Sequence, residues 1–229
     1  MNYLIKKEDM MDLWNTKLTI PIPSMDIVIF TIYKNELCVV LDKFEDGWHV
    51  LPGNILAAGF SLEDNFDAML KRKTGITWVY KEQLYTFGSP TRDKRWHVIS
   101  IAYYALVGGE EFIQKIDFTK VDLIKYSDIK QAQIFYDHKE IIDYARERLK
   151  SKLLYTNVAK EILKKHFRLS QLREVYEIVL DREIDRRNFQ KKILKLDIIE
   201  ETWKLDKTTN RPAKLYKFTN DKVKEFDIF

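Results

Sequence analysis

The sequence predicts a protein of the α+β class with two domains, which we place at residues 1–150 and 151–229. Strand-like apolar runs alternate with helical patterns in the first part, whereas short helical patterns followed by two β-like runs fill the second. The charge balance also changes, from 20 Lys and Arg against 22 Asp and Glu in the first part to 19 against 13 in the second. This basic C-terminal part favours a polyanionic partner for one domain only, although a solvated charged surface would have the same composition.

Composition indicates that both domains can bury a core, because hydrophobic residues make up 45% of the chain and aromatic residues 13%. Seven Gly and five Pro leave no low-complexity linker. Cys38 is the only cysteine, which excludes an intrachain disulfide. With no recognisable signal peptide or long apolar segment, we expect a cytoplasmic protein that makes no membrane contact.

The N-terminal domain has its clearest helix signals after a glycine-bearing loop at 51–59. Ser61 is a favoured N-cap, acidic residues follow in the first turn, and Gly75 is expected to end the helix. The other elements follow from apolar periodicity: an amphipathic stretch at 6–14, strands at 26–33, 37–41, 84–89, 98–107 and 123–126, a hairpin turn at 34–36, and a helix at 139–150.

The C-terminal domain has the element order of a winged helix-turn-helix. Helical patterns at 159–166, 170–180 and 185–196 precede β-like runs at 198–205 and 213–218. Ser170 and Asp185 are expected to cap the second and third of these helices. No Gly- or Ser-rich stretch separates this part from the first, so we expect the two domains to pack together.

The last helix of the winged helix predicts a DNA-reading face. Its apolar stripe leaves basic and amide side chains outward; Lys and Arg neutralise phosphates, and Arg, Asn and Gln pair with base edges. We expect Arg187 and Asn188 in its first turn to read bases. The predicted DNA contacts are Ser170, Gln171, Arg186, Arg187, Asn188, Lys191, Lys192, and on the wing Arg211 and Lys214. The alternative is a protein-docking scaffold with a solvated basic helix.

Two segments, WHVLPG at 48–53 and KTGI at 73–76, resemble the Nudix box and its lead-in. The resemblance implies an α/β/α sandwich whose box helix normally carries glutamates that hold catalytic metal ions. Here the frame of the box remains, but Phe60 replaces the first glutamate, and Arg72 and Lys73 replace the metal-binding pair. We therefore carry over no catalytic residue, metal ligand or cofactor. The alternative is a hydrolase with displaced carboxylates.

Further motifs resemble the Nudix-related transcriptional regulators of the NrtR type: FGSPTRDKR at 87–95, IFYDH at 134–138, FRLSQL at 167–172, DRRNF at 185–189 and RPAKLY at 211–216. The resemblance implies a homodimer that binds double-stranded DNA at a palindromic operator, represses transcription there, and releases the DNA when an effector binds. The effector is ADP-ribose in this type and a pentose sugar in the branch related to the arabinose regulator, and the sequence does not select between them. For the dimer, we expect the apolar strand at 98–107 and the aromatic-rich surface around it, in the N-terminal domain, to supply the subunit contact.

The effector is expected in the cleft between the box helix and the loop that follows residue 87. Arg92 and Asp93 could bind hydroxyls or a phosphate as a pair, or form an ion pair with each other. Trp48 could stack on a sugar or base, or fill the core. The predicted contacts are Trp48, Asn54, Phe60, Phe87, Arg92, Asp93 and Trp96. His97 and His138 have no ligand-like spacing and are interpreted as structural.

Overall fold

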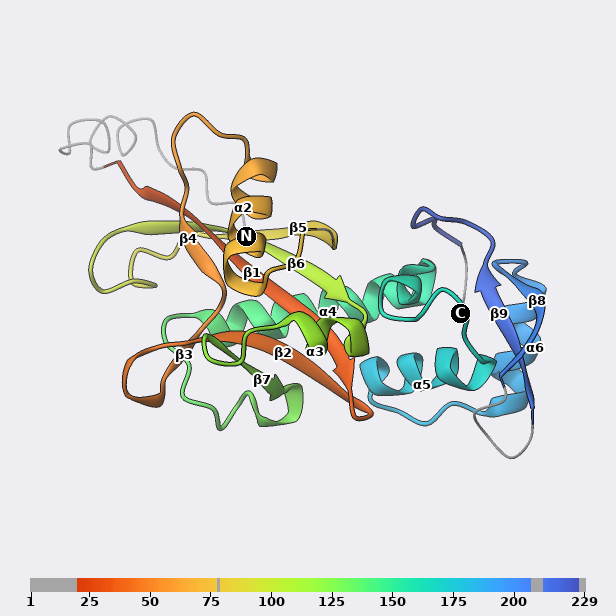
Figure 1. The fold of residues 1–229 in the computed structure, drawn as a ribbon. Helices are drawn as coiled ribbons and strands as arrows, with labels where there is room; N and C mark the ends of the chain where they lie inside the picture. The colour runs from red at the N-terminus through yellow and green to blue at the C-terminus, as the bar shows by residue number, and fades with distance from the viewer. Residues whose placement is uncertain (1–19, 78, 207–211, 227–229) are drawn as a thin grey trace, which may run out of the picture.

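The fold is taken from a computed structural model that describes residues 20–77, 79–206 and 212–226 (Figure 1). The amphipathic stretch expected at 6–14 and the wing tip with Arg211 lie outside the described residues. In the described part, no helix combines the length and apolar character needed to cross a membrane.

The N-terminal domain is built on a seven-stranded mixed sheet with the order β3-β2-β1-β6-β5. β1 and β6 form a parallel pair at its centre, while β4 adds to β1 and β7 adds to β2 in antiparallel fashion. The strands are β1 Ile22–Tyr33, β2 Glu36–Lys43, β3 His49–Val50, β4 Gly53–Ile55, β5 Tyr80–Phe87, β6 Val98–Val107 and β7 Val121–Lys125.

The hairpin between β1 and β2 confirms the turn expected at 34–36. Tyr33 pairs with Glu36, so Lys34 and Asn35 form a two-residue turn with φ values of 49° and 63°. Two successive left-handed residues match the right-handed twist of the flanking strands, and Asn tolerates this conformation better than most residues.

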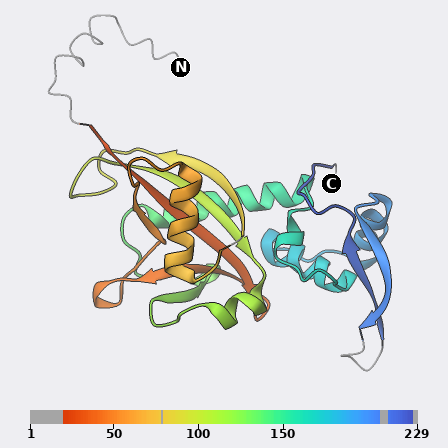
Figure 2. The ribbon, with the colours of Figure 1, turned by 45° about the horizontal axis from the view of Figure 1, so that its top comes forward.

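Helices cover both faces of the sheet (Figure 2). Alternate residues of β1 divide between them: Ile27 and Ile29 pack in the cluster that contains α2 (Leu62–Thr74), and Val28 and Phe30 in the cluster that contains α4 (His138–Tyr155). This period of two is that of a strand buried on both faces. The short helix α3 (Gly109–Lys115) adds Phe112 to the α2 side. The expected α/β/α sandwich is confirmed.

Helix α2 begins and ends as the sequence predicts. Ser61 is the N-cap and forms a capping box with Asp64, in which each side chain accepts from the other residue's backbone N–H. Gly75 closes the helix in the left-handed conformation, with φ of 76°.

The C-terminal domain is a winged helix, as predicted. Helices α5 (Leu169–Leu180) and α6 (Arg186–Lys195) precede the antiparallel pair β8 (Ile199–Asp206) and β9 (Ala213–Phe218). Both helices direct apolar residues inward, among them Tyr176 and Phe189, whose ring centroids are 5.3 Å apart.

The two domains share a continuous hydrophobic cluster around the end of α4, where Leu149 and Leu153 are fully buried. The C-terminal segment returns to this junction, because the Asn157 side chain donates to the Lys222 carbonyl and accepts from the Lys224 N–H. α4 runs through the position of our boundary to Tyr155. The division at 150 and 151 therefore stays a prediction.

Two of the predicted features are wrong, and one helix was not predicted. The helix expected at 159–166 is only a single 3-10 turn at Val158–Glu161. Ser170 lies inside α5, which is capped at Arg168 by the Gln171 side chain accepting from the Arg168 N–H. Helix α3 was not predicted, since it begins at two glycines that normally signal a loop.

The strand predicted at 98–107 is confirmed as β6, but its place in the sheet bears on the subunit contact predicted for it. β6 lies at the centre of the sheet, hydrogen-bonded to β1 on one side and β5 on the other, with most of its residues buried. Its apolar character reflects this burial between two helical layers. The strand itself therefore offers little surface for a subunit contact. A contact through the aromatic-rich surface around it stays a prediction.

Candidate effector cleft and nucleic-acid interface

A buried ionic network lies where the predicted effector residues meet the sheet. Arg92 donates from Nε and Nη2 to both carboxylate oxygens of Asp137, at 2.8 and 2.7 Å. Its Nη2 also lies 3.2 Å from Asp26 Oδ2. Burial opposes the charge of Arg92, but the hydrogen bonds and charges of the two carboxylates outweigh it and raise the pKa of Arg92. The guanidinium therefore ties the loop after β5 to β1 and to the start of α4.

Asp26 is enclosed on its remaining sides. Ser100 Oγ donates to it at 2.6 Å, and His138 Nε2 lies 3.6 Å from its second oxygen. His138 Nδ1 accepts from the Leu51 N–H at 2.9 Å, which assigns the ring proton to Nε2 in the neutral tautomer. Burial lowers the pKa of His138. A Cβ atom added at Gly53 would lie 2.2 Å from the Asp26 carboxylate. The start of β4 can therefore approach Asp26 only because Gly53 has no side chain.

The alternative of an ion pair between Arg92 and Asp93 is wrong, although both residues are buried. Asp93 instead pairs with Arg95, whose Nη2 donates at 2.8 Å and whose backbone N–H donates at 2.9 Å. The Arg95 hydrogen bond lowers the pKa of Asp93. Neighbouring residues in this loop point to different partners, so the two side chains belong to separate ion pairs.

A row of aromatic rings continues from this network. Trp48, which is half-buried, stacks on Phe135 with ring centroids 4.3 Å apart. Phe135 contacts Tyr136, which in turn lies against His138 at 5.2 Å. The Arg95 guanidinium lies over the Tyr136 ring at 5.4 Å. This chain of contacts brings Trp48 into the same part of the molecule as Arg92.

The remaining predicted effector residues divide by exposure. Asn54 is exposed and pairs with Met25 in the sheet, one position from the pair formed by Asp26 and Gly53. Phe60 and Trp96 expose 67% and 61% of their surface. Phe87 is buried against Tyr144 on α4 and is available only through rearrangement. Their contact with an effector stays a prediction.

Sequence reasoning missed the acidic partners of the network. Asp26 had a signal, because it is the only charged residue in an otherwise apolar run at 25–30. Asp137 lay in a motif noted for its resemblance, but no chemistry was assigned to it. A carboxylate in a buried strand needs a cationic partner, and Arg92 is that partner.

The position of the Nudix metal-binding glutamates is occupied by a cation. Lys73, at the end of α2, forms an ion pair with Asp42 on β2, which is buried. Burial raises the pKa of Asp42 even though Lys73 acts in the opposite direction. A divalent ion there would meet the Lys73 ammonium and the neighbouring Arg72, so these residues do not fit a catalytic metal. Among the described residues, no cluster of His, Cys, Asp or Glu is arranged to hold one.

Helix α6 presents the predicted DNA-reading face. Asp185 caps it, accepting from the Asn188 N–H at 2.8 Å, and Phe189 and Ile193 bury its inner side. The turn before it is fixed by Glu177, which accepts from Arg173 and from the Ile184 N–H, both at 2.9 Å. The exposed residues of α6 that we predicted to contact DNA are Arg186, Arg187, Asn188, Lys191 and Lys192.

The other predicted DNA contacts lie away from α6. Ser170 is exposed near the start of α5, but Gln171 lines a groove between the two domains. Lys214 is exposed on β9 and pairs with Glu201 at 2.9 Å, which raises the pKa of Lys214. A phosphate would have to compete with Glu201 for this ammonium. All the predicted contacts stay predictions at the level of single residues.

A three-layer Nudix-like domain joined to a winged helix defines a class: DNA-binding transcriptional regulators with a Nudix-related N-terminal domain. Residues 159–218 match the NrtR DNA-binding winged helix domain. The structure of NrtR from Shewanella oneidensis in complex with a 27mer DNA aligns with a TM-score of 0.78 and 30% identity, covering 85% of this chain and 92% of that one. The chain belongs to the NrtR family.

Two other relatives bear on the N-terminal domain. The ADPR responsive transcriptional repressor NtrR of Acinetobacter baylyi is 26% identical over 209 residues, which cover 86% of this chain and 82% of the relative. The separate NUDIX domain of the Shewanella protein, solved with ADP ribose, aligns with 27% identity and a TM-score of 0.50, covering 63% of this chain and 99% of that domain. An ADP-ribose pyrophosphatase of Methanocaldococcus jannaschii is 32% identical over 101 residues, covering 44% of this chain and 59% of the enzyme.

Proposed function

We propose that this member of the NrtR family is a transcriptional repressor that releases its operator when ADP-ribose binds the N-terminal domain, without hydrolysing the ligand. The Lys73–Asp42 ion pair carries the proposal, because it separates this domain from metal-dependent relatives of the same fold. The exposed basic face of α6 supplies the second half of the proposal.

The choice of ADP-ribose rests on likeness to the Acinetobacter repressor and to the Shewanella domain. The buried network supports it by tying the loop at residues 88–97, which includes Arg95, to β1 and to the start of α4. Exposed aromatic and guanidinium groups, such as Trp96 and Arg95, can stack on a base and pair with a phosphate. A pentose sugar remains the second candidate from the sequence, since exposed rings also stack on sugars.

The test of the effector is a titration of the operator complex. ADP-ribose is expected to bind the purified protein in calorimetry and to release labelled operator DNA over the same concentration range. L-arabinose is titrated in parallel. Binding and release by arabinose, with neither by ADP-ribose, would assign the protein to the sugar-responsive branch instead.

Loss of hydrolysis follows from the charge at the box helix. In a metal-dependent Nudix enzyme the helix must attract cations, but Lys73 and Arg72 repel them at a cost of about 1 kcal/mol or more per charge. The likeness to the archaeal pyrophosphatase makes hydrolysis the function to test against. We expect no turnover of ADP-ribose with Mg²⁺ or Mn²⁺; a rate on the order of 1 s⁻¹ would establish an enzyme.

We further propose a homodimer on a palindromic operator. Helix-turn-helix modules gain specificity by placing two recognition helices on half-sites one helical turn, or a multiple of it, apart. Since β6 itself is largely buried, we expect the aromatic-rich surface around it to supply the subunit contact. Light scattering at micromolar concentration tests the proposal, and a monomer in both the presence and absence of operator DNA contradicts it.

A further inference from the structure

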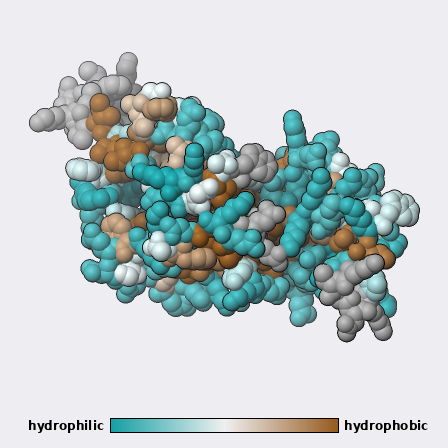
Figure 3. All heavy atoms as spheres, in the orientation of Figure 1, coloured by the Kyte–Doolittle hydropathy of each residue, from teal (hydrophilic) through white to brown (hydrophobic). Residues whose placement is uncertain are grey.

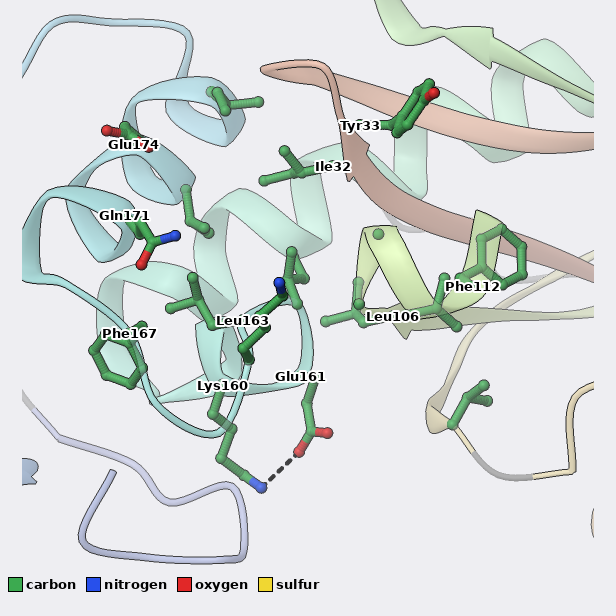
Figure 4. A pocket seen from close by; sticks show the side chains of 18 of the residues that line it. Ile32, Tyr33, Leu106, Phe112, Lys160, Glu161, Leu163, Phe167, Gln171 and Glu174 are labelled. Atoms are coloured by element: carbon green, nitrogen blue, oxygen red, sulfur yellow. Dashed lines mark ion pairs between the residues drawn. The ribbon is translucent and has the colours of Figure 1, made fainter. Parts of the chain in front are cut away.

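A groove of about 840 Å³ lies between the two domains (Figure 4). One wall comes from the ends of β1 and β6 and from α3, and the other from the segment at 160–167 and from α5. Pockets that take small ligands have volumes of roughly 300–1,000 Å³ and occur preferentially between domains. The groove therefore has the size and the position of a ligand site.

The floor of the groove is apolar and open to water. Leu106 and Phe112 form its buried base on the N-terminal side, while Ile32, Leu163 and Ile178 are half-buried along its walls. In Figure 4 the labelled side chains Ile32, Leu106 and Leu163 surround the open centre. On the face shown in Figure 3, hydrophobic residues gather in the middle of the molecule, where the domains meet. A flat ring placed here would remove apolar surface from water at about 25 cal/mol per Å².

The rim of the groove is positive. Among the lining residues are five lysines, Lys34, Lys115, Lys160, Lys164 and Lys165, against two acidic residues, Glu161 and Glu174. Lys160 and Glu161 form an ion pair at 2.8 Å, so their charges cancel. Lys164 has contacts of its own and is not counted. Lys34, Lys115 and Lys165 against Glu174 leave an excess of two positive charges around an apolar floor. This combination suits a ligand that has both a phosphate and a ring.

We propose that this groove is a second ligand site, separate from the effector cleft of the N-terminal domain, and that it binds a nucleotide. The phosphates lie among the rim lysines, with Lys34 and Lys115 on the N-terminal side. The base lies on the apolar floor between Ile32 and Leu163, whose side chains border the open centre (Figure 4).

A ligand in the groove would act on DNA binding because it contacts both domains. Gln171, Glu174 and Ile178 belong to α5, which packs on α6 through Tyr176 and Phe189. The ligand is expected to bind most tightly at one relative orientation of the two domains. That orientation determines the position of α6 relative to the N-terminal domain. Linkage is reciprocal, so DNA must change nucleotide affinity by the same factor as nucleotide changes DNA affinity. The expected effect of the nucleotide on DNA affinity rests on the proposed function, whereas nucleotide binding in the groove does not.

The experiment titrates the full-length protein with the fluorescent nucleotide mant-ATP and follows fluorescence anisotropy. Saturable binding is expected. Lys34→Glu and Lys115→Glu should each weaken it about fivefold or more, because each reverses a rim charge. Lys130→Glu makes the same charge change at an exposed site outside the groove and should stay within about twofold of wild type. Circular dichroism checks that every variant is folded.

Three outcomes overturn the proposal: no saturable binding, equal binding by the groove variants and the control, or mant-ATP displaced by ADP-ribose with affinity independent of Lys115. The last would place the nucleotide in the effector cleft. Hydrogen exchange gives a second test, since mant-ATP should protect residues 106–115 and 163–178. Operator release by ADP-ribose is measured on the same samples, so a failure of the proposed function is seen separately.

Discussion

At the scale of single residues, Arg92 is the cation that holds the buried ionic network of the N-terminal domain together. Its guanidinium neutralises two carboxylates that the sheet and α4 bury around it. Replacing only one member of such a cluster leaves uncompensated charge inside the protein, which costs far more than the cluster contributes when complete.

Arg92→Ala should therefore lower the free energy of unfolding by about 3–5 kcal/mol in a urea titration, because Asp26 and Asp137 lose their cation. Arg95→Ala is the matched control. Its side chain is 62% exposed, and loss of its pair with Asp93 should cost about 1 kcal/mol or less. Equal losses for the two variants would show that the Arg92 network is not what holds the loop.

His138 should make stability depend on pH. Burial lowers its pKa in the folded protein below the ordinary value of 6.5, so the unfolded chain binds the proton more readily. Stability should be constant above about pH 6.5 and should fall as the pH drops below it. Asp26, Asp137, Asp42 and Arg92 face the same ring, and the two-state fit must include the carboxylates at lower pH.

The measurement is the unfolding free energy of wild type and His138→Gln between about pH 5 and pH 8. Glutamine can still accept from the Leu51 N–H, and the fall below about pH 6.5 should become shallower. His166→Gln serves as the control in the other domain. Parallel curves for wild type and His138→Gln would remove His138 as the source.

At the scale of elements, α6 is the helix that we expect to read DNA. Its inner side is fixed by Phe189 and Ile193, and its first turn is fixed by the Asp185 cap. The outward residues therefore have defined directions before DNA binds. This pre-organisation separates base-reading residues from those that only approach phosphates.

Arg187→Ala or Asn188→Ala should weaken operator binding by about 1–3 kcal/mol and blur preference at one base position. Lys191→Ala should instead weaken operator and scrambled DNA alike and reduce the salt slope by about one unit. A salt series by fluorescence anisotropy on both DNAs distinguishes the two patterns. Wild-type affinity in all three variants would exclude α6 as the reader.

Elements with local signals could be predicted from the sequence, and those determined by distant contacts could not. The α2 helix follows from Ser61, its apolar spacing and Gly75, all within one turn of the element they define. The segment at 159–166 has helical spacing, but Ala159 is needed in the shared core and the chain must turn there. The central place of β6 depends on pairing with β1, which lies 76 residues away at Thr31 and Val107.

The same distinction holds for the candidate sites. The α6 face is contiguous in sequence, so the exposure of its basic residues could be predicted, whereas their contact with DNA stays a prediction. The buried network was predicted only at Arg92, because its partners Asp26 and Asp137 lie 66 and 45 residues away. The replacement of a metal-binding glutamate by Lys73 could be predicted from the resemblance to the Nudix box. Its ion-pair partner Asp42 could not. The interdomain groove had no sequence signal, since its two walls meet only in the folded chain.

At the scale of the whole molecule, the two domains are coupled through α4. Leu149 and Leu153 belong to a core cluster that extends from the sheet to the winged helix, and Asn157 fastens the C-terminal segment to the same place. No flexible linker separates sensing from DNA binding in this region. Movement of one domain is therefore expected to strain the other rather than leave it unaffected.

Leu153→Ala tests this coupling. Leu153 is fully buried, and truncating a buried leucine costs about 2–5 kcal/mol through lost transfer energy and the cavity left behind. If the shared core makes the chain one cooperative unit, the loss must appear equally in both domains. Native-state hydrogen exchange is expected to show similar reductions in opening free energy for amides of β6 and of α5. Leu70→Ala, at a buried position on α2 in the separate cluster on the other face of the sheet, is the matched control for a truncation outside the shared core. A reduction confined to α5 in Leu153→Ala would mean that the winged helix unfolds alone, and that the effector signal must cross by a contact other than α4.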